Sequence, residues 1–110
     1  MVSLMPRLEL RPNCELCDKD LPPQSAEARI CTYECTYCAD CAAKVLHDVC
    51  INCGGNLERR PVRPVKNYQP SENTGLANHS ASEKRVLTSY SREDIAAHVA
   101  RIKDIPPQDR

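Results

Sequence analysis

The concentration of cysteines in one stretch constrains this 110-residue chain more than any other feature. All eight cysteines lie within a window of 40 residues, and the last 57 residues contain none. A C-x2-C pair directs two sulfur atoms at one ion, and two pairs complete a tetrahedral all-sulfur site that selects zinc or iron. Eight ligands therefore predict two closed sites with a structural role. The spacing is Cys14-x2-Cys17-x13-Cys31-x3-Cys35-x2-Cys38-x2-Cys41-x8-Cys50-x2-Cys53.

The remaining composition indicates why such a chain needs metal. Phe and Trp are absent, and four Tyr make up the whole aromatic content, although aromatic rings supply much of the buried area of an ordinary core. Zinc binding contributes roughly 10–16 kcal/mol to the folding of zinc-finger peptides, which compensates for the missing rings. We therefore expect two Zn²⁺ ions as cofactors. An iron–sulfur cluster is the alternative, but eight interleaved ligands suit two separate ions better.

The expected compartment also favours metal over disulfides. Residues 1–10 lack the apolar stretch of a secretory signal, and no apolar run approaches the roughly 18 residues of a membrane span. We therefore expect a cytoplasmic chain, and in a reducing compartment cysteine clusters bind metal more often than they form disulfides. Oxidation that ejects zinc is open to any four-thiolate site, but nothing in the sequence marks one thiol as activated.

Two divisions of the eight cysteines are consistent with the spacing. Cys35 and Cys38 are only three residues apart, so each could serve either site. We favour the interleaved division, because the short stretch from 35 to 41 then bridges both ions and fixes their separation. A sequential division would pair Cys14, Cys17, Cys31 and Cys35, then Cys38, Cys41, Cys50 and Cys53. The interleaved division pairs Cys14, Cys17, Cys38 and Cys41 in site 1, and Cys31, Cys35, Cys50 and Cys53 in site 2.

Short regular elements are expected between these ligands. Residues 29–33 would form one arm of a small β-ribbon, and residues 42–46 would form a short helix after Cys41. The zinc-organised loops would then present a contact surface to a partner. Its expected centres are Leu16, Tyr33, Tyr37, Val45 and Leu46.

The order and spacing of the ligands resemble a RING-type cross-brace of the treble-clef kind, in an all-cysteine version. Leu16 falls where RING domains carry an apolar residue between their first two ligands, and Tyr37 falls at the aromatic position before the fifth ligand. The resemblance implies a small α+β zinc-binding module.

A closer resemblance covers residues 8–64. This stretch is similar to a small bacterial family of unknown function, DUF1272, and Ile105-Pro106-Pro107 also looks like that family. The family implies metal binding and brings no established activity. The residues that carry the resemblance are Leu8-Glu9-Leu10-Arg11-Pro12-Asn13-Cys14-Glu15, Asn52-Cys53-Gly54-Gly55 and Arg60-Pro61-Val62-Arg63-Pro64.

The sequence does not favour an enzyme. Ubiquitin-ligase RINGs usually have Pro after the seventh ligand and often a basic residue after the eighth, where this chain has Ile51 and Gly54. A redox-sensing zinc switch and a ligase therefore rank below a binding role. With every cysteine used as a ligand, no nucleophile arrangement can be proposed. We expect His47 on the surface, and His79 and His98 solvated.

Five segments describe the organisation: a lead-in at 1–13, the zinc module at 14–60, an extended flexible linker at 61–90, a short amphipathic helix at 91–105 and a tail at 106–110. Ser91 is a capping residue, and Ile95, Val99 and Ile102 recur at helical spacing. A helix this short is marginal alone in water. It must therefore fold back on the module or dock on a partner, and the sequence favours neither.

Charge does not point to nucleic acid. Fifteen basic and fifteen acidic residues balance, and two Zn²⁺ on eight thiolates would leave the loaded protein near −4. The one basic stripe, Arg59, Arg60, Arg63 and Lys66, could contact phosphates or simply be solvated. Our interpretation is a non-catalytic zinc-binding module that binds a protein partner, with nucleic-acid binding through residues 59–66 as the alternative and no membrane role.

Overall fold

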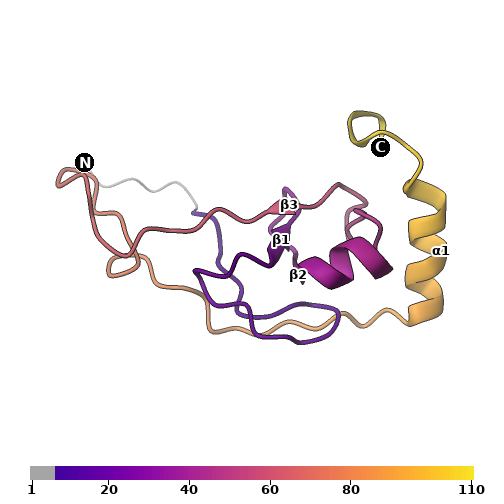
Figure 1. Cartoon of the computed structure of the whole chain (residues 1–110), viewed down its shortest axis with the longest axis horizontal. Helices are drawn as coiled ribbons and strands as arrows, with labels where there is room; N and C mark the ends of the chain where they lie inside the picture. Colours follow the sequence, from indigo (N-terminus) through magenta and orange to yellow (C-terminus); the bar gives the residue numbers. More distant parts are fainter. Residues whose placement is uncertain (1–6) are drawn as a thin grey trace.

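A small antiparallel sheet lies at the centre of the cysteine-rich part (Figure 1). The computed structural model describes residues 7–110, so the first six residues of the predicted lead-in lie outside the described residues. The strands run in the order β2-β1-β3, and helix α1 stands at one end of the molecule. The elements are β1 (Ala28–Ile30), β2 (Thr36–Cys38), the π-helical turn η1 (Cys41–Val45), β3 (Glu58–Arg59), α1 (Arg92–Ile102) and the 3-10 turn η2 (Pro107–Asp109).

The predicted β-ribbon is present, with a shorter first arm. β1 pairs with β2 so that Arg29 lies opposite Tyr37. The arm ends at Ile30 rather than at residue 33, because the chain turns between Cys31 and Cys35. In that turn the backbone N–H of Glu34 donates to the carbonyl of Cys31 at 3.0 Å, and Glu34 adopts a left-handed φ of 69°.

The predicted helix after the sixth cysteine is present as the single wide turn η1. The N–H of Leu46 donates to the carbonyl of Cys41, five residues earlier, at 2.9 Å. His47 and Asp48 then take left-handed φ values of 46° and 66°, which stops the helix and reverses the chain. The Asp48 carboxylate accepts the N–H of Leu57 at 2.8 Å, so the reversed chain is held in place.

The core corrects the predicted contact surface. Tyr37 and Leu46 are fully buried, at 0% exposure, so these two residues cannot face a partner. Tyr33 is 71% exposed, as a contact residue should be, while Leu16 and Val45 pack partly buried against the core. The physical reason is the shortage of large apolar side chains. The protein buries one of its four aromatic rings between the cysteines instead of presenting it.

Helix α1 forms as predicted and folds back on the module. Ser91 caps it, since its hydroxyl accepts the N–H of Asp94 at 3.1 Å, and Ile95 and Val99 are buried, at 1% and 4% exposure. The helix ends at Ile102, three residues before the predicted boundary. Pro106 disfavours helical geometry in the residue before it. Within residues 7–110, no helix has the length and apolarity needed to cross a membrane.

The stretch from 61 to 90 contains no helix or strand, and its last part runs back along the start of the module (Figure 1). The N–H of Ser82 donates to Leu10 at 3.0 Å and that of Thr88 donates to Glu15 at 2.8 Å. The Arg85 guanidinium pairs with Asp18 at 2.8 Å and with the neighbouring Asp20 at 2.7 Å. Residues 82–88, which we call the return segment, are therefore tied to the module, unlike the free linker expected from the sequence.

Candidate metal centre

Four cysteine sulfurs converge in the first cluster. The sulfur atoms of the first cluster all lie within 4.8 Å of one another. Two of them, from Cys17 and Cys38, are 3.8 Å apart. A tetrahedral zinc ion with Zn–S bonds of about 2.3 Å holds its sulfurs about 3.8 Å apart. The donor set therefore fits zinc in both chemistry and spacing. The members of this first cluster are Cys14, Cys17, Cys38 and Cys41.

Three sulfurs form the second cluster, and a fourth adjoins it. Cys31, Cys50 and Cys53 lie within 4.8 Å of one another. Cys35 falls outside this mutual group but is buried beside it, and the backbone N–H of Cys31 donates to the Cys35 carbonyl at 3.3 Å. The amide of Asn52 also donates to the Cys35 sulfur at 3.3 Å. Seven of the eight sulfurs are thus grouped as the interleaved division would have them, and the sequential division, which separates Cys14 from Cys38 and Cys31 from Cys50, does not match these groups.

Two of the C-x2-C pairs, Cys14/Cys17 and Cys50/Cys53, share one backbone turn. In the first, the N–H of Asp18 donates to the carbonyl of Cys14 at 2.8 Å. In the second, the N–H of Gly54 donates to the carbonyl of Cys50 at 3.0 Å. Asp18 and Gly54 both have left-handed φ values, 68° and 78°. In each pair, this turn brings the two sulfurs to the same side of the loop. We call residues 50–54 the second knuckle.

Each cluster contains one fully buried thiol whose ionised form is favoured. Burial opposes ionisation of Cys14, but the backbone N–H groups of Cys17 and Cys38 donate to its sulfur and lower its pKa. Hydrogen bonds from the thiols of Cys31 and Cys35 lower the pKa of Cys50. A metal ion binds thiolate rather than thiol, so the surroundings of these two sulfurs favour the form that binds metal.

The only buried tyrosine hydroxyl described in residues 7–110 is part of the second cluster. The Tyr37 hydroxyl lies 3.5 Å from the sulfur of Cys50 and accepts the N–H of Ile51 at 3.3 Å. Burial raises the Tyr37 pKa, so the group remains a hydrogen-bond donor to the sulfur. From the sequence this ring was expected on the contact surface, at the aromatic position before the fifth ligand, and its contact with a cysteine of the other cluster was not foreseen.

Two buried polar side chains beside the first pair were missed by sequence analysis. Asn13, at 0% exposure, donates to the carbonyls of Cys14 and of Val86 in the return segment, at 3.2 and 2.8 Å. Glu15 accepts from Arg11 at 2.9 Å and from the N–H of Thr36 at 2.6 Å. Both flank the first cysteine, which is the one sequence signal that could have drawn attention to them.

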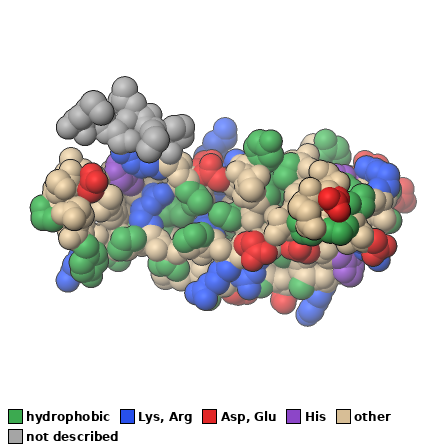
Figure 2. All heavy atoms as spheres, turned by 90° about the horizontal axis from the view of Figure 1, so that it is seen from above, with side chains coloured by type: hydrophobic (Ala, Val, Ile, Leu, Met, Phe, Trp, Pro, Cys, Tyr) green, Lys and Arg blue, Asp and Glu red, His purple; other side chains and the backbone are tan. Residues whose placement is uncertain are grey.

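The basic stripe is partly internal. Arg60 is 1% exposed and donates to the backbone carbonyls of Arg11, Leu21 and Pro22. Arg63 donates to the carbonyls of Leu8 and His79. Figure 2 shows basic and acidic side chains interspersed on one face of the molecule, without a continuous basic surface. Two of the four cations of the stripe therefore serve the fold and are neither free for phosphate contact nor simply solvated.

One histidine prediction is wrong. His47 is exposed, as expected. His98 is not solvated, because its Nε2 atom lies 2.8 Å from the carbonyl oxygen of Cys50. Its spacing on the helix, beside Ile95 and Val99, turns it toward the module.

Comparison with known proteins agrees with the resemblance seen in residues 8–64. Residues 7–63 match the family described as "Protein of unknown function (DUF1272)". The chain is 55% identical over 80 residues to uncharacterized protein R02474 of Rhizobium meliloti (strain 1021), an alignment that covers 73% of this chain and 86% of that protein. No solved structure matches it significantly. The chain belongs to the DUF1272 family.

Proposed function

We propose that this protein is a non-catalytic zinc-binding module that holds two Zn²⁺ ions and binds a protein partner. The observation that carries the proposal is the first cluster, where four sulfurs lie within 4.8 Å of one another. The ion would cross-link residues 14–17 to residues 38–41. The stretch of chain from 14 to 41 contains both β1 and β2. Such a cross-link replaces part of the apolar core that the composition does not supply.

The second ion would bind Cys31, Cys35, Cys50 and Cys53. Three of these sulfurs are already grouped, and Cys35 is buried beside them, with its carbonyl accepting the N–H of Cys31. With four sulfurs on each ion, neither site keeps an open position for water or substrate. This supports a structural role rather than hydrolysis or group transfer.

A protein partner is the better-supported target. Tyr33, Val65 and Tyr68 are 71%, 69% and 77% exposed, and exposed aromatic side chains are enriched in protein interfaces. The nucleic-acid alternative depended on a four-residue basic stripe, and Arg60 and Arg63 are committed to backbone carbonyls. We therefore do not propose nucleic-acid binding.

Metal content tests the zinc proposal. Native mass spectrometry of protein purified under reducing conditions should find two zinc ions. Cys17→Ser and Cys53→Ser change the exposed cysteine of each cluster, and each should lose one ion together with dispersed amide signals near its cluster. Thr32→Ala, an exposed neighbour of Cys31, is the matched control and should keep both ions. One ion, iron, or retention of both ions in the serine variants would contradict the proposal.

Site-specific cross-linking tests the partner. A photo-reactive amino acid in place of Tyr33 should capture a defined protein in the producing cells. The same group in place of Lys44, which is also exposed, should not capture it. Cross-links to nucleic acid, or none that differ between the two positions, would count against a protein-binding surface at Tyr33.

A further inference from the structure

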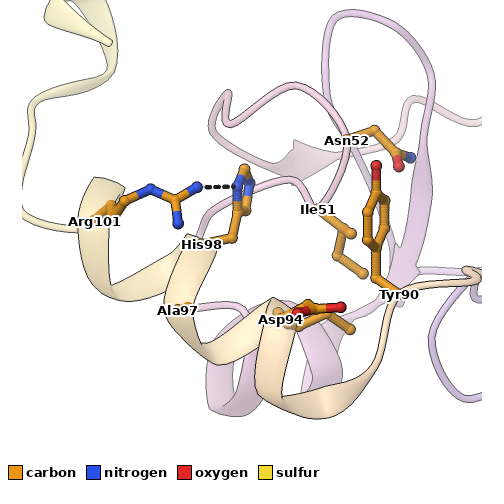
Figure 3. Close-up of a pocket in the computed structure, with 8 residues that line it drawn as sticks. Ile51, Asn52, Tyr90, Asp94, Ala97, His98 and Arg101 are labelled. Carbon is orange, nitrogen blue, oxygen red and sulfur yellow. Dashed lines mark hydrogen bonds between the residues drawn. The ribbon is translucent and has the colours of Figure 1, made fainter.

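The C-terminal segment, residues 91–110, meets the module at the second knuckle. Ile95 and Val99 on α1 are buried, and Ile102 packs so closely on Gly54 that a Cβ there would lie 3.2 Å from the Ile102 Cδ1 atom. Figure 3 shows α1 facing Ile51 and Asn52 of the knuckle across a shallow pocket. The helix therefore covers the loop that carries two of the expected ligands.

A polar chain crosses this interface, and Figure 3 shows its first link, between Arg101 and His98 on α1. The Arg101 guanidinium lies 3.4 Å from Nδ1 of His98, and Nε2 of His98 lies 2.8 Å from the carbonyl oxygen of Cys50. Because a guanidinium can only donate, Nδ1 accepts. The hydrogen-bond network therefore assigns the ring hydrogen to Nε2, which donates to the Cys50 carbonyl. That carbonyl also receives the N–H of Gly54, which closes the knuckle turn.

Arg110 contacts the chain on both sides of the second pair of cysteines, Cys50 and Cys53. The Arg110 guanidinium donates to the carbonyl of Asp48 at 2.9 Å and to that of Gly54 at 3.1 Å. These carbonyls lie just before Cys50 and just after Cys53. A second donor of Arg110 reaches the carbonyl of Ile105 at 2.9 Å, which holds the tail beside the helix end.

The first cluster is held by other parts of the chain. Asn13 and Arg85 tie the first C-x2-C pair to the return segment. Among the hydrogen bonds described for residues 7–110, those that join residues 92–110 to the module end only at Asp48, Cys50 and Gly54. The C-terminal segment is therefore in a position to affect one cluster and not the other.

We infer that His98 and Arg110 are positioning residues of the second metal site, which fix the backbone of the second knuckle and slow the loss of its ion. The inference rests on the proposed zinc binding and specifies how one of the two sites is controlled. Loss of an outer hydrogen-bond partner of a metal ligand typically costs 10–100-fold in metal affinity. The helix itself is a short element that docks through few buried side chains, which places it among the least stable parts of the fold. The second site should therefore retain its ion longer when α1 is docked on the module.

The test uses the full chain loaded with zinc and mixed with a chromophoric chelator. His98→Ala and Arg110→Ala should release the ion of the second cluster about tenfold faster or more, with the first cluster unchanged. His98→Gln keeps an N–H donor at a similar reach and should restore slow release. Arg92→Ala, an exposed change at the start of α1, is the matched control. Cadmium-113 NMR of the protein loaded with cadmium in place of zinc tells which cluster a variant affects. Only the signal of the second site should shift in His98→Ala.

The outcomes separate the two claims. A wild-type protein that binds two ions, with release unchanged in His98→Ala and Arg110→Ala, overturns the inference alone. Equal acceleration at both clusters also overturns it, since that result indicates general destabilisation. A wild-type protein that does not bind two ions overturns the proposed function and, with it, the inference.

Discussion

Arg60 offers the sharpest test of how this small protein is held together. Its guanidinium is 1% exposed, and it donates to the carbonyls of Arg11, Leu21 and Pro22 at 2.9, 3.2 and 3.1 Å. The arginine thus joins the end of β3 to two segments that lie 38 to 49 residues earlier in the chain. Among the described residues, its Nε atom is the one buried side-chain nitrogen without a partner.

The expected cost of Arg60→Ala follows from these contacts. Each carbonyl loses a partner, and a buried acceptor left unsatisfied costs about 1–3 kcal/mol. Burial of the charged guanidinium itself costs free energy, since desolvation lowers the Arg60 pKa. The net contribution of each hydrogen bond to stability is therefore near the lower end of that range. Three such bonds at about 1 kcal/mol each, together with the lost packing of the aliphatic stem, give about 3–5 kcal/mol.

Chemical denaturation at a fixed free zinc concentration measures this cost, because bound metal shifts the apparent stability. Arg59→Ala, on the adjacent exposed position of β3, should change the unfolding free energy by less than about 0.5 kcal/mol. Arg60→Met keeps the stem without the donors, and should lose about 2–3 kcal/mol. If Arg60→Met were as stable as the wild type, the carbonyl contacts would contribute nothing and the reasoning would fail.

Three further variants test local features. Tyr37→Phe removes a buried hydroxyl that contacts a cysteine sulfur and should cost about 1–2 kcal/mol in denaturation, whereas the exposed Tyr33→Phe should be neutral; equal effects would refute the role of the hydroxyl. Ser91→Ala removes the cap of α1 and should lower stability by about 1 kcal/mol, with Ser89→Ala as the uncapped control and circular dichroism as a check of helix content. Gly54→Ala places a Cβ at a φ of 78° and 3.2 Å from an α1 side chain, so it should cost about 1–2 kcal/mol and broaden the amide signals of the helix in NMR; an unchanged spectrum would show that the helix does not pack there.

Local patterns predicted the features that depend on neighbours in sequence. The C-x2-C pairs at 14–17 and 50–53 each form one turn, and the capped run from Ser91 with Ile95 and Val99 predicted α1 within three residues. The family resemblance was confirmed by the match over residues 7–63. These signals succeed because spacing alone determines which side chains share a face or a turn.

The residues that the sequence did not reveal donate hydrogen bonds to backbone carbonyls. Every residue has such a carbonyl, so the sequence does not show which one is the acceptor. Arg60, His98 and Arg110 each donate to a carbonyl that lies at least 38 residues away. Any residue type could supply such an acceptor, so no motif marks the pair. The same limit explains the return segment, whose N–H groups bond to the carbonyls of Leu10 and Glu15. For this reason the sequence did not reveal that two arginines of the basic stripe, Arg60 and Arg63, bind backbone carbonyls inside the fold.

The arrangement also suggests how the two clusters depend on each other. β2 begins at Thr36, directly after Cys35 beside the second cluster, and ends at Cys38 of the first. Tyr37 lies between them, fully buried, with its hydroxyl against Cys50. An ion lost from the first cluster would free one end of this strand and loosen the ring that contacts the second. We therefore expect Cys17→Ser to accelerate zinc release from the second cluster in the chelator assay. Variants of the C-terminal segment should leave the first cluster unaffected while the second ion remains bound, because their hydrogen bonds end at residues 48–54. The coupling between the two sites should run through β2, and because coupling free energies are reciprocal it should have the same magnitude in both directions.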